Sequence, residues 1–411
     1  MLSLCMIVRD EAATLARTLA TVQGIVDEIV VVDTGSVDNT VAIAQVHGAK
    51  IHSFAWGNDF AAARNESLHH ASGDWVLVLD ADEMLLPATA QVLQQLNQGG
   101  PLGDVAAENI LALNLLRLEL GAPQAPYTLI TRVFRRLPEI RFHRPYHETV
   151  DDSVAALQRQ DPRWQVITLG EVALHHTGYD PAVVLQRHKF DRARTIMEAY
   201  LADQPNDAYL LNKLAALYVE SDQADAALPL LNRALDQVAP ADPLTRYELH
   251  YHRALALADA PDRAAADYAA ALALDVPPRL KLGTLLNYGG LKKAQGDLVA
   301  AIDLFTQATE ADPTLALAYY NLGTAHRVRG YLDEAIAAYR QAIALAPNYP
   351  EAHQNLGVAL FKLGQMPEAL RAFRRAIDLY STTNPAAGAG LQQQVQGLGL
   401  PPTLLTQAGL L

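Results

Sequence analysis

The most informative chemical feature of the sequence is a pair of carboxylates two residues apart, Asp80 and Asp82, directly after the apolar run 75–79. An apolar run introduced by Gly73 and Asp74 predicts a strand that is buried on both faces. Polar residues at the carboxyl end of such a strand lie where open α/β sheets bind ligands. Carboxylate oxygens bind hard divalent cations, and such a cation binds a diphosphate. A solvated acidic turn explains the triplet equally well by itself, so the surrounding elements must decide.

Those elements lie in residues 1 to about 180, where apolar runs alternate with helical patterns. The predicted strands are 2–8, 29–32, 51–54 and 75–79, with further strands at 110–116, 129–134 and 166–175, and the predicted helices lie near 39–47 and 60–71. This alternation favours a mostly parallel sheet with helices on both faces. No glycine-rich phosphate loop follows the first strand, so a phosphate would be held through a cation.

Composition narrows the class of protein. The 411 residues favour two to three domains, and the net charge of −13 argues against a general affinity for nucleic acid or anionic membranes. The chain has a single cysteine, Cys5, which excludes an intrachain disulfide and favours a reducing cytoplasm. Because Cys5 lies inside an apolar run, we expect it to be a small core residue. We expect a cytoplasmic protein without a signal peptide, and no apolar stretch reaches the length of a transmembrane helix.

A repeat with a period of 34 residues replaces the strand signals from about residue 205. Residues 321–323 (Asn-Leu-Gly) recur as 355–357, and the same spacing links Gly330 to Gly364, Pro313 to Pro347 and Ala342 to Ala376. This pattern is the tetratricopeptide (TPR) signature of paired helices. We predict about five units in residues 205–382, a helical connector at 181–204, and a C-terminal segment at 383–411 that is either a cap or a partly disordered tail.

Four segments of the first half, residues 5–11, 27–36, 59–65 and 73–82, resemble the motifs of family 2 glycosyltransferases, in particular the branch with C-terminal TPR repeats. The resemblance covers about the first 180 residues, and the TPR half agrees with it. It implies an α/β GT-A domain, the nucleotide-diphospho-sugar transferase fold, at 1–180, followed by an all-α TPR superhelix. It also implies a nucleotide-diphosphate sugar as donor and Mg²⁺ or Mn²⁺ as cofactor.

The resemblance extends to single residues of the donor site. It implies that Asp33 contacts the base or ribose, that Arg64 lies near the nucleotide, and that Asp80 and Asp82 are the metal and ribose carboxylates, with Asp82 the direct metal ligand. Glu11 matches an acidic residue that is frequent after the first strand. The alternatives are a strand-end cap for Asp33, a surface arginine for Arg64 and a helix-start acid for Glu11.

Two later segments supply the remaining parts of the predicted chemistry. Residues 141–148 resemble the stretch of this branch that ends in His-Glu, and residues 174–179 resemble its His-x-Gly-Tyr element. We predict Glu148 as the base that deprotonates the acceptor, a role that contributes roughly 10²–10⁴ in rate. His176 is the predicted histidine ligand of the metal, through a neutral imidazole.

Several neighbouring residues remain as alternatives. His147 could replace Glu148 as base or bind the diphosphate, and Glu83 ranks lower because we expect it on an outward turn. Arg135, Arg136 and Arg144 either offset diphosphate charge or form a surface basic cluster.

The repeats offer an acceptor site. Asn287, Asn321 and Asn355 share one register with Asn212, and asparagine can pair with both the N–H and the C=O of an extended peptide. We therefore predict these three asparagines as acceptor-binding residues. The alternative is that they are TPR consensus residues that bond within or between helices.

Together these features predict a metal-dependent inverting glycosyltransferase, a hexosyl- or N-acetylhexosaminyl-transferase that acts on a peptide, protein or glycan acceptor. One alternative is a catalytically inactive GT-A/TPR scaffold that binds a protein partner. A nucleotidyltransferase would normally carry a glycine-rich loop with Arg or Lys after the first strand, and residues 7–11 lack it.

Overall fold

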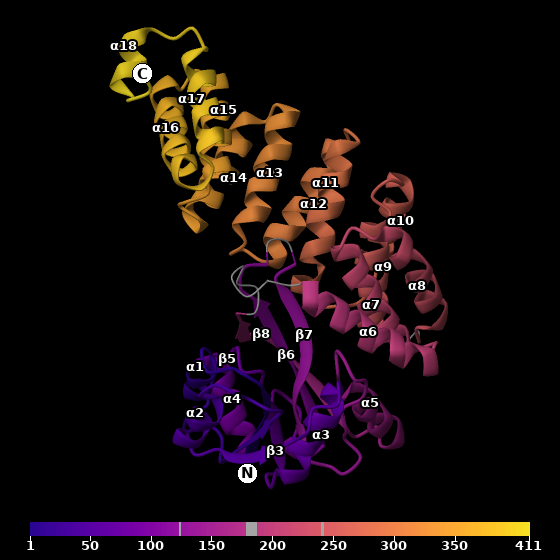
Figure 1. Ribbon diagram of the computed structural model, residues 1–411. Coiled ribbons are helices and arrows are strands. Elements are labelled where there is room, and N and C mark those ends of the chain that lie inside the picture. Colours follow the sequence, from indigo (N-terminus) through magenta and orange to yellow (C-terminus); the bar gives the residue numbers. More distant parts are fainter. Residues whose placement is uncertain (123–124, 178–186, 240–241) are drawn as a thin grey trace. The chain divides into compact units, whose positions relative to one another are not determined.

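The computed structural model describes residues 1–122, 125–177, 187–239 and 242–411 (Figure 1). Their contacts divide them into two compact units, Met1–Ala122 with Pro126–Ala256, and Leu257–Leu411. The first unit contains the sheet and the first helical hairpins, and the second contains only helices. In the described part of the chain, no helix is both long and apolar enough to span a bilayer.

The first unit is built on one eight-stranded sheet of order β3-β2-β1-β4-β7-β6-β8-β5. Strands β1 to β4 are parallel to one another, and β6 is parallel to β8. Strand β7 runs antiparallel to both β4 and β6, and β5 antiparallel to β8. The sheet is therefore mixed, with four parallel pairings among its seven, and the short β6–β7 connection can join only antiparallel neighbours. The strands are β1 (Leu2–Val8), β2 (Glu28–Asp33), β3 (Lys50–Ser53), β4 (Trp75–Val78), β5 (Glu83–Leu85), β6 (Ile110–Glu119), β7 (Tyr127–Arg135) and β8 (Gln165–His176).

Five α-helices accompany this sheet: α1 (Leu15–Thr21), α2 (Thr40–Val46), α3 (Phe60–His70), α4 (Pro87–Asn97) and α5 (Asp151–Gln160). The two predicted helices match α2 and α3. The carboxylate of Asp59 begins α3 by accepting the N–H of Ala62 at 2.9 Å, which is the usual way to satisfy a free N–H at a helix start. The N-cap of α2 is Asn39, and Asp38 before it accepts the N–H of Thr40 at 2.9 Å.

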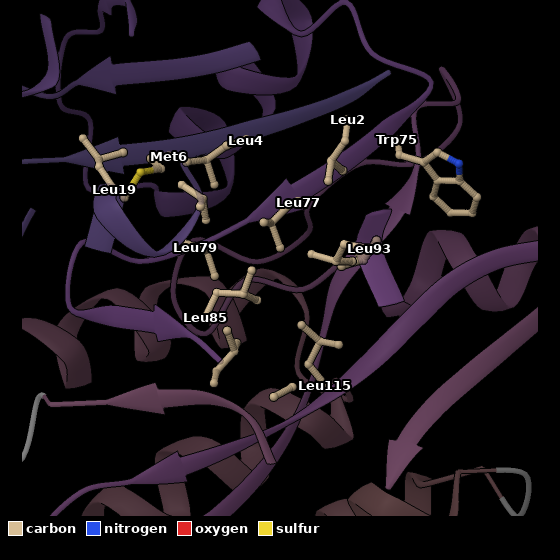
Figure 2. Close-up of a cluster of buried hydrophobic side chains, with 14 of the residues drawn as sticks. Leu2, Leu4, Met6, Leu19, Trp75, Leu77, Leu79, Leu85, Leu93 and Leu115 are labelled. Atoms are coloured by element: carbon tan, nitrogen blue, oxygen red, sulfur yellow. The ribbon is translucent and has the colours of Figure 1, made fainter. Parts of the chain in front are cut away.

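The core lies on both faces of the sheet, as the apolar run at 75–79 predicts. Leu77 and Leu79 pack on one face with Leu85 of β5, Leu93 of α4 and Leu115 of β6 (Figure 2). The alternate residues Val76 and Val78 pack on the other face, where the fully buried Cys5 also lies. Because successive side chains of a strand point to opposite faces, only a strand covered on both sides can bury all of them.

The helical region repeats one packing device. A Cβ on Gly323 would lie 2.8 Å from the ring of Tyr339, and Gly289 and Gly357 meet the rings of Phe305 and Phe373 in the same way. Each pair joins the two helices of one repeat, so the recurrent glycine allows the close approach that its spacing predicts. The helices are α6 (Arg187–Asp203), α7 (Ala208–Glu220), α8 (Ala224–Gln237), α9 (Pro243–Ala256), α10 (Pro261–Leu272), α11 (Leu282–Ala294), α12 (Leu298–Ala311), α13 (Ala316–Arg329), α14 (Leu332–Leu345), α15 (Pro350–Lys362) and α16 (Met366–Thr383).

The C-terminal segment is a packed cap. Helices α17 (Pro385–Gln396) and α18 (Pro402–Gln407) follow the last repeat. They bury Leu391, Val395, Leu405 and Leu410 in the same cluster as the side chains of α15 and α16. An end repeat needs such a cover for its apolar face. Gly178, Tyr179 and the start of the predicted connector, 181–186, lie outside the described residues.

Candidate active site

The loops after β1 and β2 meet at the carboxyl edge of the sheet. Asp10 accepts the N–H of Val37 at 2.7 Å and donates its own N–H to the hydroxyl of Ser36 at 3.0 Å. The N–H of Ala12 reaches Asp38 at 3.1 Å. Since β1, β2 and β4 are parallel, the segments that follow them lie side by side, as the sequence predicts.

Two predicted nucleotide-binding residues lie in these loops. The carboxylate of Asp33 is nearly buried and accepts the N–H groups of Gly35 and Ser36 at 3.1–3.3 Å. Glu11 accepts the hydroxyl of Thr14 at 3.1 Å. These contacts stabilise turns, and contact with a nucleotide stays a prediction for both residues.

The carboxylate of Asp80 lies between two arginines. Arg64 of α3 donates from Nη2 to Oδ1, and Arg132 of β7 donates from Nη2 to Oδ2 at 2.6 Å. Partial burial by itself would raise the pKa of Asp80, but Arg132 and Arg64 outweigh it and hold that pKa below its usual range. Arg64 is only 3% exposed, so it is not a surface arginine.

Arg64 also binds the predicted base. Its Nε donates to Oε1 of Glu148 at 2.9 Å. The segment that carries Glu148 is fixed on α3 by Asn65, which exchanges two hydrogen bonds of 2.8–2.9 Å with the backbone of Phe142. The structure thus brings Glu148, Arg64 and Asp80 together from three distant segments.

His176 lies beside Asp82 at the end of β8. Its Nε2 is 3.1 Å from Oδ2 of Asp82, and its Nδ1 is 2.5 Å from Oε2 of Glu119. Burial lowers the pKa of His176, but the hydrogen bonds with Asp82 and Glu119 outweigh it and raise the pKa to about 10. The sequence analysis predicted His176 and Asp82 as ligands of one metal ion, and it did not identify Glu119.

Glu83 is not on an outward turn as expected; it is fully buried in the short strand β5. Its Oε2 accepts the N–H of Asp80 at 3.0 Å, which fixes the turn that carries both predicted aspartates. Its Oε1 accepts from Arg117 at 2.6 Å and from Arg132 at 2.9 Å. The expectation failed because β5 pairs with the distant strand β8, a contact that local sequence does not reveal.

These pairs form one continuous network of charged side chains, here called the ion chain. Sequence reasoning missed Glu83, Arg117, Arg132 and Glu119 as members; the available signal was charged residues two apart, 117 and 119, inside an apolar strand. Two buried guanidinium nitrogens of the chain, Nη1 of Arg64 and Nε of Arg132, have no hydrogen-bond partner among the described residues. In order of contact, the ion chain is Glu148, Arg64, Asp80, Arg132, Glu83, Arg117, Glu119, His176 and Asp82.

The other basic candidates lie outside the ion chain. Arg135 donates to two backbone carbonyls and stacks on Trp75, and Arg136 donates to the carbonyl of Gly73. Arg144 pairs with Asp152 and Asp207. His147 is exposed and has a positive φ of 54°.

Among the described residues, no cluster of three or more His, Cys, Asp or Glu side chains is arranged to hold a metal ion. Asp82 and His176 nevertheless offer an oxygen and a nitrogen donor side by side. Mg²⁺ and Mn²⁺ sites on nucleotides often use one or two protein ligands, with phosphates and waters completing the shell. The pair therefore fits such a cation, whereas both oxygens of Asp80 face arginines.

The asparagines of the repeats make contacts within the protein. Nδ2 of Asn287 donates to the carbonyl of Gly283 at 2.9 Å, and Nδ2 of Asn355 donates to the hydroxyl of Tyr320 at 3.1 Å. Asn212 is fully buried and binds Glu248 at 2.7 Å. These bonds are those that the consensus interpretation predicts, and acceptor binding by Asn287, Asn321 and Asn355 stays a prediction.

Comparison with known proteins assigns the two halves. The glycosyl transferase family 2 model matches residues 3–110, and tetratricopeptide repeat models match 183–243, 323–364 and 350–382. A TPR repeat-containing protein of Synechococcus elongatus is 45% identical over 76% of this chain and 75% of its own length.

Two further relatives align with the first half. An uncharacterized glycosyltransferase of Rickettsia felis is 32% identical over 43% of this chain and 62% of its own length. The prophage-derived glycosyltransferase SunS of Bacillus subtilis is 25% identical over 49% of this chain and 45% of its own length. This chain thus spans less than two thirds of either relative. The chain therefore belongs with the TPR repeat-containing proteins, and its N-terminal part, which holds Arg64, Asp80, Asp82 and Glu83 of the ion chain, matches glycosyl transferase family 2.

Proposed function

We propose that this protein is a metal-dependent inverting glycosyltransferase that moves a hexosyl or N-acetylhexosaminyl group from a nucleotide-diphosphate sugar to an acceptor recruited by its repeats. The observation that carries the proposal is the Asp82–His176 pair at the carboxyl edge of the sheet, joined through the ion chain to Glu148. Displacement at a sugar carbon needs a group that holds the cation on the leaving diphosphate and a base that takes the proton of the acceptor, and the ion chain contains a candidate for each.

In this proposal Asp82 and His176 hold Mg²⁺ or Mn²⁺, and Glu11 and Asp33 border the nucleotide. The cation supplies Lewis-acid stabilisation of the nucleoside diphosphate that leaves. Arg64 and Arg132 hold Asp80 in place, and their unpartnered nitrogens are donors for oxygens of the donor substrate. Asp80 then positions these two arginines and contacts the ribose, and it is not a direct metal ligand.

Glu148 removes the proton of the acceptor. The hydrogen bond from Arg64 to Oε1 orients its carboxylate, so that the other oxygen can accept the proton. The acceptor attacks the sugar on the side opposite the diphosphate, so the reaction is a single displacement that inverts the anomeric centre. No covalent glycosyl-enzyme is formed.

The repeats recruit the acceptor, a peptide, protein or glycan, with Asn287, Asn321 and Asn355 as contact residues. Asn287 and Asn355 already bond within the protein through Nδ2. An asparagine side chain can pair with both the N–H and the C=O of an extended chain, so acceptor binding would exchange such internal bonds for bonds to the acceptor.

The decisive experiment follows release of nucleoside diphosphate from a panel of nucleotide sugars with Mn²⁺ or Mg²⁺. We expect one donor to be turned over only with metal, and Asp82→Ala to reduce the rate by more than about 100-fold, because several kcal/mol of transition-state stabilisation is lost. Absence of both release and calorimetric binding for every donor would favour the inactive scaffold.

A further inference from the structure

We propose that Glu119, supported by Arg117, is a positioning residue that holds His176 with Nε2 directed at Asp82, so that the pair is preorganised for a divalent cation. This inference rests on the metal dependence in the proposed function. It assigns a role to two residues of β6 that the motifs of the first half do not include.

The register of the sheet places Glu119 where it can do this. It is the last residue of β6, and His176 is its Cα partner at the end of the parallel strand β8. Glu119 is only 4% exposed, and its Oε2 lies 2.5 Å from Nδ1 of His176. The ring therefore has one nitrogen against a buried carboxylate and the other toward Asp82.

The second oxygen of Glu119 is also held. Oε1 accepts from Nε of Arg117 at 2.7 Å and from the hydroxyl of Thr128 at 2.9 Å. With both oxygens bonded, the carboxylate cannot rotate without losing a charge-assisted hydrogen bond. The position of the imidazole is therefore set by groups that are themselves fixed.

Arg117 ties this support to the other metal ligand. Its Nη1 donates to Glu83 at 2.6 Å, and Glu83 accepts the N–H of Asp80 in the turn that leads to Asp82. One guanidinium thus joins the strand end that carries His176 to the turn that carries Asp82. Because a guanidinium is planar with donors in a fixed fork, it sets the separation of the two carboxylates that it binds.

The chemistry of metal-binding histidines explains what this arrangement achieves. A cation that binds at Nε2 would displace the proton that this nitrogen directs at Asp82. In the neutral imidazole that results, a carboxylate that accepts the Nδ1–H leaves the lone pair on Nε2 and raises the basicity of that nitrogen. Loss of such a partner typically weakens metal affinity by about 10- to 100-fold. A carboxylate that only stabilised the fold would not have this effect.

The test measures binding of Mn²⁺ alone to the full chain, from the electron paramagnetic resonance signal of free Mn²⁺. We expect Glu119→Ala to weaken binding by about 10- to 100-fold and Glu119→Gln to weaken it less, because the amide oxygen can still accept from Nδ1. Arg117→Lys keeps the charge but loses the fork, so its effect should also be intermediate. The matched control is Glu28→Gln. Glu28 is also a buried, ion-paired carboxylate, but it lies at the start of β2, away from the carboxyl edge that carries the site, so Mn²⁺ affinity should be unchanged.

A second measurement reads the ring directly. In protein labelled with ¹⁵N-histidine, the nitrogen shifts of His176, assigned with His176→Gln, report which nitrogen carries the proton. We expect Glu119→Gln to shift these resonances, while Glu28→Gln leaves them in place. This readout needs neither metal nor substrate, so it remains valid if a variant binds no cation.

The outcomes separate the two proposals. Wild-type Mn²⁺ affinity and wild-type His176 shifts in folded Glu119→Gln would overturn the positioning role and leave the proposed function intact. Absence of Mn²⁺ binding by the wild-type protein, both alone and with nucleoside diphosphates present, would overturn the metal dependence itself, even if the variant shows the expected shift.

Discussion

At the residue scale, the notable property of the site is that each carboxylate of the ion chain has a cationic partner. Arg64 shows why this matters, since it is 3% exposed and binds both Asp80 and Glu148. Burial disfavours its charge, but the two carboxylates outweigh burial and raise the pKa of Arg64. Removing one partner of such a network leaves the others as uncompensated charges in a poorly solvated place.

Arg64→Met should therefore destabilise the first unit by about 3–5 kcal/mol, the cost of breaking a buried pair. Urea unfolding followed by circular dichroism measures this. Arg340→Met is the control, because its pair with Glu368 is 58% and 45% exposed and should contribute less than about 1 kcal/mol. Equal losses in the two variants would contradict the buried role of Arg64.

The lowered pKa of Glu28 predicts that the folded protein loses stability in acid. Burial raises the pKa of Glu28, but hydrogen bonds from Lys50, Ser3 and Ser72 outweigh it and lower the pKa from 4.5 to about 2. A folded-state pKa below the unfolded value stabilises the protein above about pH 4.5, and this stabilisation is lost as the pH falls through about 2. At about 1.4 kcal/mol per pKa unit, the contribution is of order 3 kcal/mol.

Glu28→Gln should thus be less stable than wild type at pH 7, and the difference in unfolding free energy should shrink as the pH falls from about 4.5 toward 2. Denaturant titrations at a series of pH values measure it. A difference that stays constant over this range would show that the carboxylate charge is not the source.

At the element scale, both halves depend on close approach between elements that are distant in sequence. The edge strand β5 is three residues long, yet it buries Glu83 because it pairs with β8. In the repeats, Gly323 and Tyr339 occupy facing positions of α13 and α14. The burial of Glu83 and the requirement for glycine at position 323 both result from the element that packs against them.

Gly323→Ala should destabilise the second unit by about 1–3 kcal/mol, because its Cβ would lie 2.8 Å from the ring of Tyr339. Gly290→Ala is the matched control, since it lies within helix α11 with no atom within 4 Å of the added Cβ. That change should stabilise by about 0.5–1 kcal/mol through helix propensity. Thermal unfolding of both variants tests the pair; a stabilised Gly323→Ala would refute the packing role.

At the scale of the whole molecule, a family 2 domain and a repeat array share one chain. The alignment with the TPR repeat-containing protein of Synechococcus elongatus covers 76% of this chain, so it includes parts of both. In the proposed function the array selects the acceptor and the sheet performs the transfer. The two tasks should then separate in kinetics.

The triple variant Asn287→Ala, Asn321→Ala, Asn355→Ala should raise the Michaelis constant for the acceptor about 10-fold or more, since each lost hydrogen bond contributes about 0.5–1.5 kcal/mol. Steady-state kinetics with varied acceptor measure this, and donor hydrolysis without acceptor reports that the first unit is intact. Asn348→Ala lies outside the register and serves as control. Unchanged acceptor kinetics would assign the three asparagines to helix packing.

Sequence alone determined the features that depend on local pattern. The apolar run at 75–79 predicted a strand buried on both faces, and the 34-residue period predicted paired helices, because both kinds of packing leave a periodic pattern in the sequence. Tertiary structure alone decided the support of the site. Arg117 and Glu119 of β6, Arg132 of β7 and Glu83 of β5 meet only because β7 returns antiparallel between β4 and β6, and β8 lies between β6 and β5. The sequence around a charged residue in a strand does not show which residue it will pair with. Ion pairing across strands depends on register and strand order rather than on local spacing.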